Sequence, residues 1–227
     1  MLVNPDFSQR AIVTPAEHIW SGSPQHGVER IMLDRLGEEQ AQATTIVRYL
    51  PHSFFPAHSH PQGEEILVLE GVFSEGEHHF NSGWYLRNPP GSSHQPSSGA
   101  AGAMIFVKLR QMSQYDDAVV RINTQDDANW QHYTTYSECP LYQSEDENVR
   151  LERRLPGDLL FKNELPQGAE LLILAGSLSE NNQSYERYSW LRLPAGDFPA
   201  LIVGSEGVTL YIKTGHLRER NLPEVAL

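Results

Sequence analysis

Three histidines and one glutamate have the types and the spacing of ligands for a single metal ion. His58 and His60 are separated by one residue, Glu64 follows shortly after, and His94 lies further along the chain. Imidazole nitrogens and carboxylate oxygens bind zinc, iron, manganese, nickel and copper. These four side chains therefore predict one mononuclear metal site.

The residues around the first three ligands predict a strand, a turn and a second strand. Alternate side chains of an extended strand point to the same face, so His58 and His60 can share one ion. Pro61–Gly63 is a turn sequence, and Ile66–Leu69 is an apolar run typical of a strand. A hairpin would place Glu64, at the start of the second strand, beside the two histidines.

A second turn is expected to bring His94 to the same place. Pro89-Pro90-Gly91 combines the fixed φ of proline with the positive φ that glycine allows, so it predicts a tight turn. His94 follows this turn, at the beginning of the next expected strand. The fourth ligand would therefore arrive from a separate part of the chain.

These residues resemble the two sequence motifs of the cupin superfamily. His58 to Gly71 fits His-x-His-x3-Glu-x6-Gly, and Gly83 to His94 fits Gly-x5-Pro-x-Gly-x2-His. Ser98 stands where the second motif usually has asparagine, at a position that is not a ligand in the family. The resemblance implies an all-β barrel of the double-stranded β-helix, or jelly-roll, type, with the metal held by the three histidines and the glutamate.

The residues within and around the motifs narrow the resemblance to the ChrR-type cupins. The segments that carry it are residues 60–75, 85–94 and 105–111, with 27–35 and 43–49 upstream. This subgroup is named for the carboxy-terminal cupin domain of the anti-sigma factor ChrR, which binds zinc in its cupin and restrains an extracytoplasmic-function sigma factor. The resemblance implies zinc in the site and a protein partner in a sigma-factor pathway.

The second half of the chain repeats the first at a fixed offset of 105 residues. Pro61–Gly63 aligns with Pro166–Gly168, and Gly71 aligns with Gly176. Turn residues shared at one offset predict the same strands and turns twice. Short apolar runs punctuated by glycine and proline predict an all-β structure. We therefore expect two tandem cupin barrels, a bicupin.

The two expected barrels differ in their ligands. The first comprises residues 1–115, with N-terminal strands, and the second comprises residues 116–227. The four predicted ligands align, in chain order, with Asn163, Leu165, Ala169 and Pro199. Because the turn residues remain while all four ligands are replaced, the second barrel is expected to be degenerate and to bind no metal at this place.

Composition and charge exclude several classes of partner. The 227 residues carry a net charge of −12, whereas nucleic-acid binding relies on basic groups. No apolar run approaches the roughly 18 residues that span a membrane, and the N-terminus lacks the basic and apolar segments of a signal peptide. Cys139 is the single cysteine, so no internal disulfide is expected. These features predict a cytoplasmic protein with no nucleic-acid or membrane partner, and edge strands predict a homodimer.

The predicted ligand set is compatible with two kinds of site. Tetrahedral zinc would be filled by the four side chains, which describes a structural or sensing site. Six-coordinate iron or manganese would leave two positions open for a substrate and dioxygen, which describes an oxygenase. Zinc is the metal that the resemblance implies, with iron, manganese and nickel as alternatives.

Two functional hypotheses follow. The first, which the sequence favours over an enzyme, is a regulatory or sensing role in sigma-factor-dependent transcription, with a protein partner or a small-molecule ligand. The chain has no match to the His-x3-Cys-x2-Cys motif that anti-sigma domains of the ChrR kind carry. The second is a non-haem metal dioxygenase, because some bicupins similar to this subgroup cleave carbon–carbon bonds of hydroxylated aromatic ketones. Residues that could line a substrate pocket, or simply fill the barrel core, are Phe54, Phe55, Phe73 and Tyr85.

Other charged residues near the motifs are candidates for supporting roles. Glu65 aligns with Glu170 of the metal-free repeat, so we expect Glu65 to support the site rather than bind the ion. Arg48, Arg87 and Lys108 are candidates for orienting an anion. The alignment of Arg87 with an arginine of the second repeat favours a structural role for it.

Overall fold

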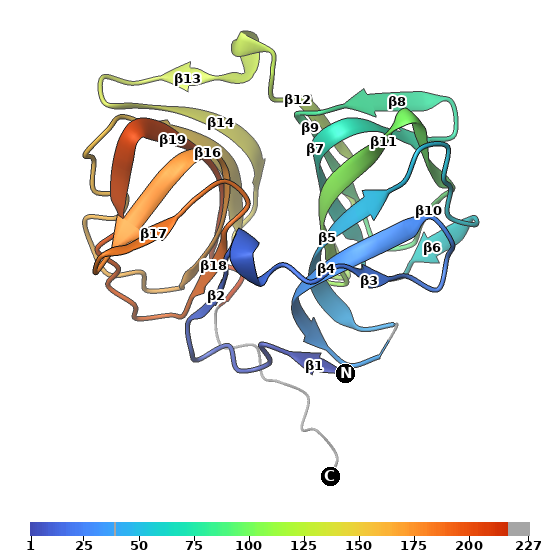
Figure 1. Ribbon diagram of the computed structural model, residues 1–227, viewed down its shortest axis with the longest axis horizontal. Coiled ribbons are helices and arrows are strands. Elements are labelled where there is room, and N and C mark those ends of the chain that lie inside the picture. The colour runs from blue at the N-terminus through green and yellow to red at the C-terminus, as the bar shows by residue number, and fades with distance from the viewer. Residues whose placement is uncertain (39, 218–227) are drawn as a thin grey trace. The chain divides into compact units, whose positions relative to one another are not determined.

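The computed structural model describes residues 1–38 and 40–217, which form β-strands joined by turns and loops (Figure 1). The last ten residues of the second expected barrel, 218–227, lie outside the described part. The helices of the described residues are two short 3-10 turns, η1 (Pro15–Glu17) and η2 (Asp127–Asn129). Neither has the length and apolar character needed to cross a bilayer. The expected all-β fold is confirmed.

The chain divides into two compact units, each made of two pieces. The first unit holds Met1–Pro5 and His18–Asn129, and the second holds Asp6–Glu17 and the chain from Trp130 onward. Each unit has its own large antiparallel sheet and its own apolar core. The two tandem barrels expected from the repeat are therefore present.

The bounds of the units differ from the expected 1–115 and 116–227 because the repeats exchange an edge strand. β2 (Ala11–Val13) precedes the first repeat but pairs with β18 (Trp190–Leu193) in the second unit. β12 (Val120–Asn123) precedes the second repeat but pairs with β9 (Trp84–Asn88) in the first unit. These pairings join strands that are distant in sequence, so the order of residues alone does not reveal them.

The first unit contains the predicted ligand motifs. Its other strands are β1 (Leu2–Val3), β3 (Ser21–Gly22), β4 (Val28–Leu36), β5 (Gln42–Tyr49), β6 (His58–His60), β7 (Glu64–Glu75), β8 (His78–Asn81), β10 (Ser92–His94) and β11 (Pro96–Leu109). The large sheet has the order β1-β4-β5-β11-β7-β9-β12, with β3 on β4 and β8 on β7, and β6 and β10 form a separate two-stranded sheet. The central strands β7 and β11 are buried on both faces, and alternate residues of each, Ile66 and Val68 in β7 and Ile105 and Val107 in β11, belong to the unit's core cluster.

The second unit has the same order of strands around its own core. Its remaining strands are β13 (Gln131–His132), β14 (Tyr136–Gln143), β15 (Asn148–Arg154), β16 (Ala169–Glu180), β17 (Gln183–Tyr185) and β19 (Ile202–Thr214). The sheet has the order β13-β14-β15-β19-β16-β18-β2, with β17 on β16. β15, β16, β17, β18 and β19 thus take the places of β5, β7, β8, β9 and β11 in the first unit.

The central strands β7 and β16 show why both repeats have glycine at one equivalent position. Gly71 and Gly176 have φ values of +69° and +73°. A Cβ added at Gly71 would lie 2.2 Å from Gly102 O, and one added at Gly176 would lie 2.0 Å from Gly207 O. Both positions therefore require glycine, for its backbone freedom and for its lack of a side chain.

Candidate metal centre

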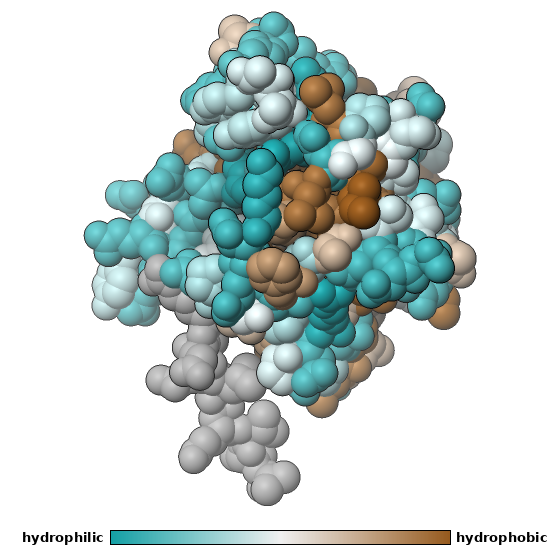
Figure 2. Space-filling model, turned by 90° about the vertical axis from the view of Figure 1, so that its left-hand side faces the viewer, coloured by the Kyte–Doolittle hydropathy of each residue, from teal (hydrophilic) through white to brown (hydrophobic). Residues whose placement is uncertain are grey.

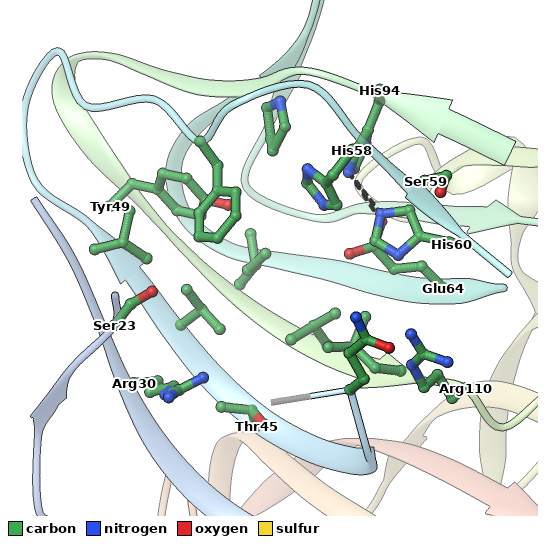
Figure 3. Close-up of a pocket in the computed structure, with 18 of the residues that line it drawn as sticks. Ser23, Arg30, Thr45, Tyr49, His58, Ser59, His60, Glu64, His94 and Arg110 are labelled. Atoms are coloured by element: carbon green, nitrogen blue, oxygen red, sulfur yellow. Dashed lines mark hydrogen bonds and ion pairs between the residues drawn. The ribbon is translucent and has the colours of Figure 1, made fainter. Parts of the chain in front are cut away.

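β6 and β10 bring the three predicted histidine ligands together. The two strands pair antiparallel, with His94 opposite His58 and Ser92 opposite His60. The imidazole ring centroids lie 4.6 Å apart for His58 and His60, 4.7 Å for His60 and His94, and 4.9 Å for His58 and His94. Figure 3 shows the three rings gathered above Glu64 at one side of a cavity. The structure therefore collects residues from three strands at one place.

The ligating atoms of His60, His94 and Glu64 have the spacing of one coordination sphere. His60 Nε2 and His94 Nε2 are 2.9 Å apart, and Glu64 Oε2 lies 3.4 Å from the first and 3.5 Å from the second. Metal–ligand bonds of about 2.0–2.2 Å place neighbouring ligand atoms roughly 3 Å apart. A ring nitrogen of His58 lies within 4.8 Å of nitrogens of the other two histidines. The three histidines, and Glu64 with His60 and His94, therefore have spacings compatible with one metal ion.

Hydrogen bonds orient two of the imidazoles. His58 Nδ1 lies 2.8 Å from Pro56 O, and His94 Nδ1 lies 2.7 Å from Glu75 Oε1. Both partners are acceptors, so each Nδ1 carries the proton and donates it, while Nε2 keeps its lone pair. Metal-binding histidines generally have such an outer carbonyl or carboxylate, which sets the tautomer and the direction of the ring.

Glu75, Asn88 and Arg121 form a network behind the ligands that sequence reasoning missed. Asn88 Nδ2 donates to Glu75 Oε1 at 2.9 Å and to Glu64 Oε2 at 3.3 Å. Arg121 Nη2 donates to Glu75 Oε2 at 2.9 Å and to Asn88 Oδ1 at 2.6 Å. The network therefore connects Glu64 with Glu75, the carboxylate that orients His94.

Aligning the two repeats could have revealed only part of this network. Asn88 aligns with Leu193, a change from polar to apolar like those at the ligand positions. Glu75 aligns with Glu180, so it did not stand out. In the second unit Glu180 Oε2 lies 2.5 Å from Nη1 of Arg10, which precedes β2, so a glutamate–arginine pair supports the edge strand in both units. What is specific to the first unit is the hydrogen bond between Glu75 and a histidine.

Burial keeps two of the histidines neutral. Burial lowers the pKa of His58, and the hydrogen bond to Pro56 O opposes this only in part. Burial also lowers the pKa of His60, although the carboxylate of Glu64 acts in the opposite direction. Both imidazoles are therefore in the neutral form near pH 7, which is the form that binds a metal ion.

His94 and Glu75 shift each other's pKa values in opposite directions. Burial disfavours the charged form of His94, but the hydrogen bond to Glu75 and the charge of Glu64 outweigh burial and raise its pKa. Burial also disfavours the charged form of Glu75, but its hydrogen bonds to His94 and Asn88 outweigh burial and lower its pKa. The pair therefore favours a proton on His94 when no metal is bound.

The four predicted ligands line a cavity of about 390 Å³ in the first unit. Its apolar wall includes Val47, Ile105 and Val107 of β5 and β11, and the ring of Phe55 lies edge-on to His58 with centroids 5.1 Å apart. Concave sites with apolar walls and a few convergent polar groups commonly bind small molecules. An ion held by the ligands would therefore be accessible from this cavity.

The four aromatic residues that were candidates for the pocket lining or for the barrel core differ in their positions. Phe55 lines the cavity, whereas Phe73 belongs to the core of the first unit. Tyr85 is fully buried, and Phe54 is 50% exposed. The sequence did not separate these outcomes, because each residue lies in a strand or turn next to a motif.

Glu65 does not face the predicted ligands. Successive side chains of β7 point to opposite faces, and Glu65 Oε2 lies 3.4 Å from Arg87 Nη1. Arg87 Nε also donates to Asp116 Oδ2 at 3.1 Å. Glu65 and Arg87 therefore belong to a buried charged cluster on the other side of the strand, as the matching arginine in the second repeat suggested for Arg87.

The other two residues that were candidates for orienting an anion, Arg48 and Lys108, also interact with other partners. Arg48 Nη2 lies 2.6 Å from Glu29 Oε2, and Lys108 Nζ donates to Thr44 Oγ1 at 3.0 Å. The guanidinium groups that line the cavity are those of Arg30, Arg35 and Arg110. Sequence reasoning missed these three because none lies inside a ligand motif.

The second unit is packed with apolar side chains at the equivalent place. Leu165 and Ala169, which align with His60 and Glu64, belong to a core cluster rich in leucine. Leu193, the equivalent of Asn88, belongs to the same cluster. Within residues 1–38 and 40–217, both groups of three side chains that could hold a metal lie in the first unit.

Residues 8–113 match the family model described as the ChrR cupin-like domain. This part of the chain is a ChrR-type cupin domain. The match includes both ligand motifs and ends before the second repeat begins, so it covers slightly less than half of the chain. No match was found among curated proteins.

Solved cupin structures share the fold of both units. A Nostoc punctiforme protein proposed to be a dioxygenase matches with a TM-score of 0.76 and 16% identity, covering 96% of this chain and 85% of its own. Escherichia coli pirin in complex with nickel(II) gives 0.67 and 8%, covering 91% and 98%. Oxalate decarboxylase from Lactobacillus farciminis gives 0.62 and 8%, covering 90% and 86%. At these identities the likeness establishes the bicupin fold alone.

Proposed function

We propose that the first cupin domain binds one divalent metal ion through His58, His60, Glu64 and His94, and that it is a mononuclear non-haem dioxygenase of small hydroxylated aromatic ketones. The observation that carries the proposal is that all four ligands line the cavity of about 390 Å³. A small molecule in this cavity would meet the ligand set directly, as an oxygenase requires. The dioxygenase proposed for the Nostoc protein of the same fold supports this choice.

The residues of the chain have distinct tasks in this function. Bound iron or manganese would supply open coordination positions for a substrate and dioxygen. Glu75 orients His94, and Asn88 holds Glu64 in place through hydrogen bonds. The apolar wall formed by β5 and β11 excludes water and accepts the aromatic body of the substrate.

A sensing role is the second candidate, favoured by the match of residues 8–113 to the family named for ChrR. In this role zinc would occupy the same four ligands, and a small molecule in the cavity would alter the contact with a protein partner in a sigma-factor pathway. Cytoplasmic location, a homodimer and the lack of a nucleic-acid or membrane partner are our predictions for either function.

The deciding experiment is elemental analysis of the purified protein, followed by oxygen uptake with small hydroxylated aromatic ketones. The dioxygenase proposal expects about one iron or manganese per chain and oxygen consumption that depends on the ketone. About one zinc per chain without oxygen uptake would favour the sensing candidate.

A double variant, His58→Ala with His60→Ala, assigns the metal to this site. It should lose the metal, whereas a matched double variant at two exposed histidines, His78→Ala with His132→Ala, should keep it. Metal that remains bound to the first variant, or that is lost equally from both, would rule out the proposed ligand set.

A further inference from the structure

Arg110 follows β11 directly and lies beside the strand that carries Glu64. Leu109 pairs with Glu64 between β11 and β7, and the Arg110 N–H donates to Gly63 O at 3.1 Å. Arg110 lines the cavity, and Figure 3 shows its side chain on the same side of the cavity as Glu64 and His60. The backbone therefore holds Arg110 beside the strand of Glu64, and its side chain lines the same cavity as the ligand set.

The backbone of Arg110 adopts a conformation that its side chain disfavours. Its φ is +59°, in the left-handed region that costs free energy for residues other than glycine. The equivalent position in the second unit, 105 residues later, is Gly215, with a φ of +91°. The fold thus requires a positive φ at this position in both units, and glycine meets the requirement without strain.

This comparison indicates that the first unit needs the side chain of Arg110. Arg110 combines this strain with a place beside the cavity, and the combination points to a functional role for its side chain. Within the described residues, the candidate ligands and the cavity that they line belong to the first unit. The arginine and the ligand set therefore occur together.

The charges around the cavity indicate what the side chain would bind. Within the described residues, no carboxylate forms an ion pair with the Arg110 guanidinium. Arg30 and Arg35 also line the cavity, and Arg35 Nε donates to Gly37 O at 3.2 Å. Glu64 is the one carboxylate among the described lining residues. The described lining thus contains three arginines and one carboxylate, in a protein whose net charge is −12.

We propose that Arg110 binds the carboxylate of a small organic acid whose keto or hydroxyl oxygen reaches the metal. The planar guanidinium matches a carboxylate with two parallel hydrogen bonds, and the apolar walls accept the rest of the hydrocarbon body. The inference rests on the proposed metal site. It narrows the aromatic ketones of that function to those that also carry a carboxylate.

The test compares an acid with a neutral molecule of similar shape. Benzoylformate and 1-phenylpropane-1,2-dione both have a phenyl ring and two adjacent oxygens, but only the first is an anion. Each is titrated into the cobalt(II)-loaded protein, and the visible absorption of cobalt reports binding. We expect benzoylformate to bind at least tenfold more tightly than the dione.

The variant Arg110→Gly should weaken benzoylformate binding at least tenfold, leave dione binding unchanged and raise the midpoint of thermal unfolding. Arg110→Lys should recover part of the affinity, because the charge is kept while the planar fork is lost. The matched control is His52→Gly. His52 is an exposed residue with a φ of +57° whose equivalent is Gly157, and this variant should change neither affinity.

Results that contradict the role of Arg110 can be distinguished from results that contradict the metal site. Equal affinities for the two probes, or no effect of Arg110→Gly on benzoylformate, would overturn the role of Arg110. A cobalt spectrum unchanged by millimolar benzoylformate would do the same. Failure to take up one cobalt per chain would remove the metal site, and calorimetric titration of the metal-free protein with benzoylformate would then decide on Arg110 by itself.

Discussion

His94 Nδ1 and Glu75 Oε1 lie 2.7 Å apart, so a predicted metal ligand is oriented by a carboxylate that lies outside both motifs. The glutamate is itself held by Asn88 and Arg121, which come from two other strands. The direction of one imidazole thus depends on three strands besides its own. This dependence can be measured.

We predict that Glu75→Gln lowers metal affinity about 10- to 100-fold, the usual cost of losing an outer carboxylate of a histidine ligand. The matched control is Glu180→Gln, which removes the equivalent carboxylate from its pair with Arg10 in the second unit. Competition with a chelator of known affinity measures both variants. Equal losses of metal affinity in the two variants would contradict the role given to Glu75.

Metal affinity should fall as the pH decreases through the raised pKa of His94. A ligating nitrogen must be free of its proton, and the pKa of His94 lies above its ordinary value of 6.5, so the loss should begin above that pH. In Glu75→Gln the main cause of the raised pKa is removed, so the midpoint of the loss should move to lower pH. Affinity titrations between pH 5 and 8 check this, and an unchanged midpoint would argue against the pairing.

In the metal-free protein, the pair should make the free energy of unfolding depend on pH. The contribution of His94 should increase as the pH falls, whereas metal affinity decreases. Because the folded-state pKa of His94 is raised, its protonation contributes stability that is fully present below about pH 6.5 and is lost as the pH rises through the raised value. Glu75, with a lowered pKa, contributes stability that is lost as the pH falls through its folded-state value. Urea unfolding of wild type and Glu75→Gln at several pH values isolates the contribution of the pair.

Adding back a metal should stabilise the wild-type protein in proportion to its affinity. Free metal at 100 times its dissociation constant should raise the free energy of unfolding by about 2.7 kcal/mol. The variant His58→Ala with His60→Ala should show no such increase. Urea unfolding with and without a chelator makes the measurement, and equal stabilisation of both proteins would place the bound metal elsewhere.

A carboxylate placed at the position equivalent to Glu64 should not create a metal site in the second unit. Ala169 is fully buried among leucines, at the position equivalent to Glu64. We expect Ala169→Glu to lower the free energy of unfolding by about 3–5 kcal/mol, because it buries a charge without a partner. Ala195→Glu, at an exposed position, should change it by only about 0.5 kcal/mol. A small effect at Ala169 would mean that polar groups or water reach this core.

Residues that lie close together in the sequence revealed much of this protein. The alternation of His58 and His60, the turn at Pro61–Gly63 and the turn before His94 were enough to predict that these candidate ligands come together from β6, β7 and β10. Likewise, glycines and prolines at a constant offset predicted two copies of one fold. These signals are local, because turn type and strand alternation depend on a few neighbouring residues.

Pairing between distant strands was decided only by the tertiary structure. The exchange of β2 and β12, and with it the arrival of Arg121 behind the ligands, depends on which sheet edge each strand meets. The left-handed backbone of Arg110 likewise depends on the end of β11 being tied to the turn at Gly63. The sequence by itself determined the strands, the turns, the repeat and the candidate ligands. The supporting network and the charged cavity were decided by packing, because each is built from residues that meet only when sheets form.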